Sequence, residues 1–383
     1  MNIQKEKPIR ILILSCNTGQ GHNAASKAVQ EAMINSGMEC DIEDALCFIS
    51  NGISRAMSNG HTLMYRHFPG VFRWGYGYAE KHRNAFEKTS LLYRFFAQGS
   101  ERLYQFYREN EYDGIICAHV FAGLMVTDMK SRFEVSARTY FMSTDYTCSP
   151  STDHSDLDTY FIPHHALTEE FTKLGIPVER LVASGIPVRS ECYSVSSNEN
   201  AKKTFGDNEK HRHLVMMCGS MGWGPMEKLA CHLAKELSNI QELTVVCGTN
   251  QKLYQKLKKR FDSERRVHIR GYVEDISKLL DSADVYITKP GGISVTEAAT
   301  KKLPLVFIDA VAGCEEYNMH FFMQRGCAVT TKPIKELASL CLSILSDEAM
   351  LQRMKSAYAG IETADAATYI CRYIQNDLGG ITI

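Results

Sequence analysis

The sequence predicts an α/β protein with two Rossmann-like domains that face each other across a cleft. The chain has 383 residues, which is more than one hydrophobic core usually organises. Short apolar runs alternate with helical patterns in both halves, as expected of parallel sheets covered by helices. A polar stretch between about 194 and 210 is rich in Ser, Asn and Lys and has the composition of an interdomain linker.

The first domain is expected over residues 1–195 and begins with a strand, a glycine turn and a helix. Residues 9–14 form an apolar run, and small or apolar residues then recur at helical spacing from Ala24 to Met33. Three later apolar runs, GIICA, TYFMS and TYFIP, each precede a loop with a histidine or an aspartate. We expect these strands to be parallel and their loops to meet at one edge of the sheet.

The second domain is expected over residues 210–360. Five strand-like runs separated by helical patterns indicate another doubly wound sheet, namely HLVMMC, LTVVC, RVHIRG, DVYIT and LPLVFI. The last stretch, residues 361–383, has a helical pattern. We expect it to cross back to the N-terminal domain.

The composition excludes several classes of protein. With 44% hydrophobic and 23% charged residues and a formal net charge of −1, the chain is globular, and no nucleic-acid partner is expected. The 13 cysteines lack paired CxxC spacing, which indicates free thiols in the reducing cytoplasm. The first apolar run is too short for a signal peptide, and no run approaches the about 18 residues of a spanning helix. Any membrane contact is therefore expected to be peripheral.

The strongest local signal is KPGGISVTE, residues 289–297, which follows the strand DVYIT and opens a helix. Gly291 and Gly292 allow the backbone to approach a ligand, and the free N–H groups of a helix start attract a diphosphate. Glu297, one turn into the helix, is placed to reach ribose hydroxyls. The alternative is a structural helix start with Ser294 as its cap.

Two other glycine turns each follow the first expected strand of a domain. Residues 218–224, CGSMGWG, lack the lysine of a P-loop, so they do not predict ATP hydrolysis, and a plain strand-to-helix turn is the alternative. Residues 19–22, GQGH, place His22 at the carboxyl end of the first strand, where open α/β sheets bind ligands. An imidazole there can take a proton from an attacking hydroxyl. The alternative is that His22 caps its helix.

Three ordered motifs carry a family resemblance. They are ILILSCNTGQGHNAASKAV from residue 11, GIPVR at 185–189 and TKPGGISVTEAATKKLPLVFIDAVAGCEEYN from residue 288. Together they closely resemble the bacterial processive diacylglycerol glucosyltransferases and the plant monogalactosyldiacylglycerol synthases. They resemble more distantly the N-acetylglucosaminyltransferase of peptidoglycan lipid II. The resemblance spans nearly the whole chain and implies the GT-B glycosyltransferase fold.

The resemblance also implies site residues. His22 would be the general base that activates the acceptor hydroxyl, Asp145 would shape the acceptor or base environment, and the backbone of Gly21 would approach the sugar phosphates. The implied donor-binding residues are Ser220 for the diphosphate, Gly271, Tyr272 and Val273 for the uracil, Gly291 and Gly292 for the phosphates, Glu297 for the ribose, and Glu315, Glu316 and Asn318 for the donor sugar.

The implied reaction is an inverting transfer of a hexose from a UDP-sugar to diacylglycerol. One base deprotonates the acceptor and helix N-termini stabilise the departing UDP, so no metal or other cofactor is required. UDP-glucose is the first donor to expect. The sequence departs from the family pattern at Gln20 and Cys314, where many members have glycine and glutamine, and these positions bear on loop shape and donor-sugar contacts.

Two patterns resemble metal ligands. Asp156-Leu157-Asp158 spells the DxD with which metal-dependent glycosyltransferases hold manganese, but it precedes the strand TYFIP within a polar run, which favours a solvated strand entry. His164 and His165 are adjacent rather than helix-spaced and make a poor metal pair. No metal site is therefore expected.

Residues 61–108 form a segment with eight basic and three acidic residues and many aromatic ones. Surfaces that dip into anionic bilayers have this composition, so we expect the segment to bind the inner face of the cell membrane. The alternative is an aromatic helical core with a solvated basic face.

The leading hypothesis is thus a UDP-sugar:diacylglycerol glycosyltransferase at the cytoplasmic membrane surface. Three alternatives stay open. They are a transferase for another lipid-linked acceptor, a catalytically silent UDP-sugar-binding regulator, and a UDP-sugar epimerase.

Overall fold

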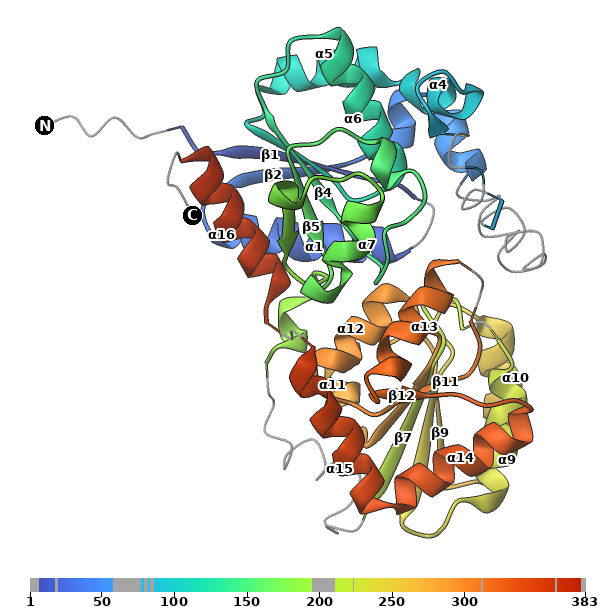
Figure 1. Cartoon of the computed structure of the whole chain (residues 1–383). Helices are drawn as coiled ribbons and strands as arrows, with labels where there is room; N and C mark the ends of the chain where they lie inside the picture. The colour runs from blue at the N-terminus through green and yellow to red at the C-terminus, as the bar shows by residue number, and fades with distance from the viewer. Residues whose placement is uncertain are drawn as a thin grey trace, which may run out of the picture. The chain divides into compact units, whose positions relative to one another are not determined.

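A computed structural model describes residues 7–17, 20–57, 77–78, 82, 86–194, 211–222, 224–310, 313–361 and 364–379. Its contacts divide the chain into two units, shown in Figure 1. The first unit comprises Met1–Ser190, Ala312–Cys314 and Ala364–Ile383, and the second comprises Glu191–Val311 and Glu315–Thr363. The linker was expected between about 194 and 210, and residues 195–210 lie outside the described residues. None of the described helices is long and apolar enough to span a membrane.

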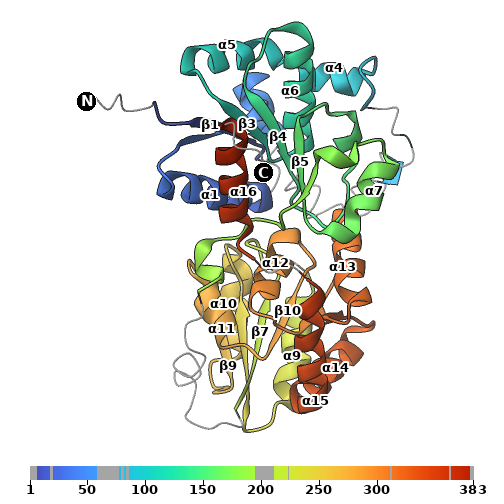
Figure 2. The same ribbon diagram turned by 60° about the vertical axis from the view of Figure 1, so that its left-hand side comes forward.

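The first unit contains a six-stranded parallel sheet with the order β2-β1-β3-β4-β5-β6. Its strands are β1 (Arg10–Ser15), β2 (Glu39–Asp44), β3 (Gly114–Cys117), β4 (Arg138–Met142), β5 (Thr159–Ile162) and β6 (Leu181–Ala183). Its α-helices are α1 (Gln20–Asn35), α4 (Leu91–Ala97), α5 (Ser100–Asn110), α6 (Val120–Arg132), α7 (Thr168–Lys173) and α16 (Ala366–Leu378). Ile11 to Leu14 of β1 are fully buried, because helices cover both faces of the sheet, as Figures 1 and 2 show.

The C-terminal helix α16 completes the first unit. It packs against α1, beside which it lies in both ribbon views. Near its end, Asp377 accepts hydrogen bonds from Arg138 Nε at 3.0 Å and from the Tyr140 hydroxyl at 2.7 Å. Because both donors belong to β4, this carboxylate ties the last helix of the chain to the middle of the first sheet.

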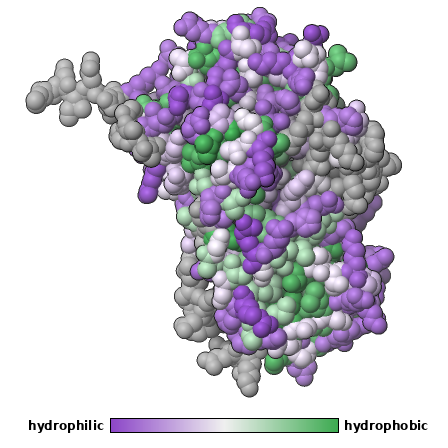
Figure 3. Space-filling view, in the orientation of Figure 1, coloured by the Kyte–Doolittle hydropathy of each residue, from purple (hydrophilic) through white to green (hydrophobic). Residues whose placement is uncertain are grey.

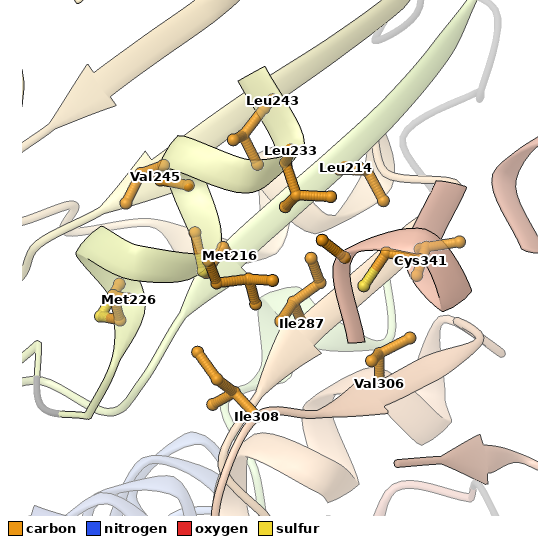
Figure 4. Packing of buried hydrophobic residues seen from close by; sticks show 14 of the residues in the cluster. Leu214, Met216, Met226, Leu233, Leu243, Val245, Ile287, Val306, Ile308 and Cys341 are labelled. Carbon is orange, nitrogen blue, oxygen red and sulfur yellow. The ribbon is translucent and has the colours of Figure 1, made fainter. Parts of the chain in front are cut away.

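The second unit contains a parallel sheet with the order β12-β11-β10-β7-β8-β9. Its strands are β7 (Arg212–Met217), β8 (Gln241–Val246), β9 (Val267–Arg270), β10 (Val285–Thr288), β11 (Leu305–Phe307) and β12 (Ala328–Val329). Its α-helices are α9 (Met226–Glu236), α10 (Gln251–Arg260), α11 (Ile276–Asp281), α12 (Gly292–Thr300), α13 (Cys314–Gln324), α14 (Ile334–Ser346) and α15 (Glu348–Ser356). In the core, Met216 and Ile287 of the sheet pack with Leu233 of α9 and Cys341 of α14, as Figure 4 shows.

The two parallel six-stranded sheets confirm the predicted α/β class with Rossmann-like units. The apolar runs of the sequence correspond to β1, β3, β4 and β5 and to β7 through β11. Three edge strands, β2, β6 and β12, were not predicted. All 13 cysteines are free, and Cys47 alone among them is exposed.

A buried histidine makes stability of the second unit pH-dependent. His213 on β7 is 3% exposed, with Nε2 2.8 Å from Thr244 Oγ1 and Nδ1 3.1 Å from Ser282 Oγ. Burial lowers the pKa of His213 from 6.5 to about 4. The unfolded chain therefore binds the proton more readily, and we expect the free energy of unfolding to fall by about 3 kcal/mol as the pH drops through this range.

The measurement is urea unfolding at several pH values between 6.5 and 4, compared with a His213→Gln variant. Glutamine does not titrate, so the variant should lose this part of the pH dependence. An unchanged slope in the variant would assign the acid sensitivity to other groups.

Candidate functional site

Two loop clusters lie where the strand order reverses. In the first sheet this point is between β1 and β3, and in the second between β7 and β10. Open α/β sheets bind ligands outside the carboxyl ends of their strands at these points. The turn GQGH follows β1, CGSMGWG follows β7 and KPGG follows β10, so all three predicted turns lie at reversal points, although Gly19 and Trp223 are outside the described residues.

His22 is the third residue of α1, inside its first turn rather than before it. Its Nδ1 lies 2.9 Å from the carbonyl oxygen of Ala118 and 3.0 Å from Thr144 Oγ1. Because a carbonyl only accepts hydrogen bonds, Nδ1 carries the proton, and Nε2 is the basic nitrogen of the neutral ring. The loops after β3 and β4 thus orient the histidine that follows β1.

A second histidine, which the sequence analysis did not single out, lies against the first. The rings of His22 and His119 meet edge to face, with centroids 4.7 Å apart. His119 is the N-cap of α6, where its Nδ1 accepts a hydrogen bond from the Phe121 N–H at 3.1 Å. Nδ1 is therefore unprotonated, and the ring hydrogen is on Nε2. The signal was a histidine two residues after the strand GIIC, at the reversal point.

Hydrogen bonds between side chains hold the turn that carries Gly21. Ser15 Oγ donates to Asn23 Oδ1 at 2.6 Å, and Asn23 Nδ2 donates to Asn17 Oδ1 at 2.9 Å. Asn17 Nδ2 in turn donates a hydrogen bond to Asp44 Oδ2 on β2, also at 2.9 Å. This chain fixes the entry to α1, and hence the position of the His22 backbone.

Asp145 is partly exposed in the loop after β4 and follows Thr144, which contacts His22. Glu170 of α7 anchors this loop, since its Oε1 accepts from Thr147 Oγ1 at 2.5 Å and from the Cys148 N–H at 2.7 Å. Through Thr144, the structure brings the loop that carries Asp145 to the His22 ring, and the role implied for Asp145 stays a prediction.

In the second unit, the turns after β7 and β8 interlock. The carbonyl oxygen of Ser220 accepts a hydrogen bond from the Thr249 N–H at 2.8 Å. Gly222 and Gly248 have positive φ angles of 54° and 57°. A Cβ on Gly248 would lie 2.0 Å from the Ser220 carbonyl oxygen, so this close approach requires glycine.

Lys289 joins these turns to the start of α12. Its Nζ lies 3.2 Å from Glu315 Oε1, with the two side chains 11% and 15% exposed. A Cβ on Gly219 would lie 3.7 Å from Lys289 Cε, so the lysine stem runs along the turn after β7. Lys289 begins the motif KPGGISVTE, but the sequence indicated no role for its side chain. The structure brings it together with Gly219, which precedes Ser220, and with Gly291, whose N–H donates to the Lys289 carbonyl oxygen at 2.9 Å.

The helix α12 begins at Gly292 with Gly291 as its N-cap, and no side chain caps it. The alternative that Ser294 is the cap is wrong, because Ser294 lies inside the first turn. Asn318 of α13 is fully buried and donates from Nδ2 to the Pro290 carbonyl oxygen at 2.9 Å. That contact fixes the turn, whereas Glu316 is partly exposed on the same helix.

Glu297 is 6% exposed on α12. It lies close to Tyr286, whose pKa is raised by burial and further by the Glu297 charge. Gly271, Tyr272 and Val273 follow β9, two strands from β7 in the sheet, and Tyr272 is 66% exposed. This segment is at the same carboxyl edge as the other turns but not at the reversal point.

Both DxD carboxylates are bound within the first unit. Asp158 accepts from the Thr139 N–H at 2.8 Å and from Lys130 Nζ at 3.1 Å, and Asp156 pairs with Arg180 at 2.7 Å. Burial favours the neutral acid, but the hydrogen bonds from Thr139 and the Lys130 charge hold the pKa of Asp158 below its ordinary value. The pair thus ties strands together. Among the described residues, no cluster of three or more His, Cys, Asp or Glu is arranged to hold a metal.

Most of the basic aromatic segment 61–108 before residue 86 lies outside the described residues. In its described part, Phe96 is buried and stacks on Phe121, with ring centroids 3.8 Å apart. Leu91 and Leu92 at the start of α4 are 83% and 45% exposed, and Figure 3 shows hydrophobic surface where α4 lies in Figure 1. The segment therefore combines an aromatic core with exposed leucines.

Comparisons with known proteins agree with the motifs. Residues 22–188 match the family model of monogalactosyldiacylglycerol (MGDG) synthase, and residues 221–359 match that of glycosyl transferases group 1. The chain is 26% identical over 366 residues to the processive diacylglycerol beta-glucosyltransferase of Bacillus cytotoxicus, covering 94% of this chain and 92% of that one.

Solved structures show the same fold. MurG of Acinetobacter baumannii has a TM-score of 0.65 at 13% identity, covering 96% of this chain and 100% of that one. The S. aureus MnaA–UDP structure has a TM-score of 0.64 at 13% identity, covering 98% of each chain. The family resemblance drawn from the three motifs and the GT-B fold are both confirmed.

The interlocked turns predict a steep penalty for a side chain at Gly248. We expect Gly248→Ala to lower the free energy of unfolding by about 3 kcal/mol, because its Cβ would displace the Ser220 carbonyl. Gly224→Ala is the matched control, since Gly224 also has a positive φ but has open space around it. It should cost about 1 to 2 kcal/mol. Equal losses in urea unfolding would show that the turns separate easily.

Proposed function

We propose that this GT-B glycosyltransferase moves a hexose, in the first instance glucose, from a UDP-sugar to diacylglycerol at the inner face of the cell membrane. The observation that carries the proposal is the orientation of His22, whose Nδ1 is directed to the Ala118 carbonyl. This contact keeps the ring in the tautomer with Nε2 as the base. The names of the matched relatives support diacylglycerol as the acceptor and glucose as the sugar.

His22 acts as the general base in the proposed reaction. Nε2 takes the proton of the acceptor hydroxyl while that oxygen forms a bond to the anomeric carbon of the sugar. The bond from this carbon to the UDP oxygen breaks on the opposite face, so the configuration inverts and UDP leaves with the electron pair. A positioned base of this kind contributes about a hundredfold or more to the rate.

The second unit stabilises the departing UDP. Gly291 lets the backbone approach the diphosphate, and the free N–H groups of α12 from Gly292 onward bind it together with the turn at Ser220, as helix starts do. The Lys289 ammonium, paired with Glu315 in this structure, adds a positive charge where negative charge develops. Glu297 binds the ribose, the backbone of residues 271–273 binds the uracil, and Glu315 and Glu316 meet the donor sugar. These groups perform the transfer without a metal.

Membrane contact through the first unit supports access to the lipid acceptor. Leu91 and Leu92 are exposed at the start of α4, with Lys88 and Arg94 close by in the sequence. Apolar side chains flanked by basic ones suit the boundary between headgroups and acyl chains.

The test is transfer from labelled UDP-glucose, UDP-galactose and UDP-N-acetylglucosamine to diacylglycerol in detergent micelles, with and without a chelator. We expect a glucolipid whose yield the chelator does not change. His22→Ala should lower turnover by a hundredfold or more while the thermal shift produced by UDP stays as in the wild type. UDP binding without transfer by the wild-type protein would instead indicate a regulator.

The ring contact predicts that His119 positions His22. His119→Asn keeps an N-cap residue for α6 but removes the ring against His22, so kcat should fall about tenfold with little change in the KM for donor. The pH profile of kcat should also shift, because the base is no longer held by a second imidazole.

His119→Ala is the control, since it removes the cap as well as the ring. Its additional loss of thermal stability measures the structural role. If His119→Asn has wild-type kcat and an unshifted pH profile, His119 serves only as the cap.

A further inference from the structure

The second unit has a basic surface that is separate from its glycine turns. Residues 251–270 contain eight basic and two acidic residues in a chain of net charge −1. Within this segment, Lys252, Lys256, Lys259 and Arg260 of α10 are all exposed, and we call these four the α10 stripe. Figure 3 shows hydrophilic residues along the edge of the second unit where α10 lies in Figure 1.

The helix presents the stripe on one side. Its members recur at i, i+4, i+7 and i+8, which places them within about 100° of arc. Leu257 is buried, and Leu253 and Tyr254 pack against the core of the second unit. Asn250 caps the helix by accepting from the Leu253 N–H at 3.0 Å. The stripe is therefore carried by an anchored helix and faces away from the core.

Most of the stripe's charge is not neutralised by the protein. Lys256 pairs with Glu227 at 2.8 Å, and Arg266, just beyond the helix, pairs with Glu264 at 2.9 Å. Lys252, Lys259 and Arg260 form no ion pair with any carboxylate in the described parts of the chain. Three of the four positive charges on the stripe thus remain for an external anion.

The α10 stripe has the chemistry of a headgroup contact. From Lys252 to Arg260 it is about 12 Å long, enough to meet more than one lipid phosphate. Its lysines are point charges on flexible stems, and no large apolar side chain accompanies them on that side, so contact is at the depth of the headgroups. Nucleic-acid surfaces present aromatic rings to bases, whereas Tyr254 is half-buried, with Lys258 Nζ 5.6 Å from its ring centroid.

We propose that the α10 stripe binds the surface of an anionic phospholipid bilayer, giving the enzyme a membrane contact in its second unit. The inference rests on the proposed function in that a lipid acceptor brings the enzyme to such a surface. The contact is electrostatic, so it weakens as salt shortens the range of the charges. It differs from the contact of the segment 61–108, which includes exposed apolar side chains.

The test is co-sedimentation of the full chain with vesicles of phosphatidylcholine, with or without phosphatidylglycerol, over a series of salt concentrations. The triple variant Lys252→Glu, Lys259→Glu and Arg260→Glu should bind the anionic vesicles at least about tenfold more weakly than the wild type. Its salt dependence should also be shallower. Binding to vesicles of phosphatidylcholine alone should not change.

The matched control is Lys332→Glu, Lys335→Glu and Arg353→Glu. These residues are exposed elsewhere on the second unit, and the net charge changes by the same amount. An equal loss in both triple variants would reduce the effect to net charge and overturn the proposal, as would unchanged binding in the stripe variant. A larger loss of binding to single-stranded RNA than to vesicles would assign the stripe to nucleic acid and also overturn it.

Transfer in detergent micelles separates this proposal from the proposed function. The stripe variant should turn over diacylglycerol in micelles at the wild-type rate, because the stripe includes none of the site residues. Stripe-dependent vesicle binding by a wild-type protein that makes no glycolipid would refute the transferase activity alone. Normal transfer by a protein whose vesicle binding ignores the stripe would refute the stripe alone.

Discussion

The covering of parallel strands on both faces is the constraint on which each unit depends. A parallel strand returns to the same sheet only through a crossover, and the crossover helices bury both faces. Residues 11–14 of β1 and all four residues of β10 are accordingly fully buried. The carboxyl ends of all strands in such a sheet then lie on the same side. Where the strand order reverses, the loops that follow the two neighbouring strands lead away from each other. His22 follows β1 and Lys289 follows β10 at these two edges.

Short hydrogen bonds hold the loops at the carboxyl ends of these strands in defined positions. In the first unit, residues 22, 118 and 144 meet at one imidazole nitrogen, although nearly a hundred positions separate the first from the second. In the second unit, glycines with positive φ let two turns interlock around Ser220. In each arrangement one partner is a backbone carbonyl, of Ala118 in the first unit and of Ser220 in the second, which does not change rotamer.

Buried ion pairs serve two purposes in this protein. Lys130 and Asp158 join α6 to the entry of β5, at a place remote from the strand reversal, so their pairing is structural. Lys289 and Glu315 are more deeply buried and lie beside the turns that follow β7 and β10. Lys289 is thus a candidate to pair with a phosphate in place of Glu315. This difference in location is why one DxD-like pattern is structural and an unremarked lysine is a candidate for the site.

The sequence by itself determined the α/β class, nine of the strands and the three glycine turns, because strands covered on both faces leave continuous apolar runs and turns need glycine. It missed β2, with the polar sequence ECDIED, and the short β6 and β12, because strands near a sheet edge need not be apolar. Only the tertiary structure decided that Ala118 and Thr144 orient His22, that His119 lies against it, and that Lys289 pairs with Glu315. Those contacts join distant positions in the chain, and no local periodicity records which loops a sheet brings together.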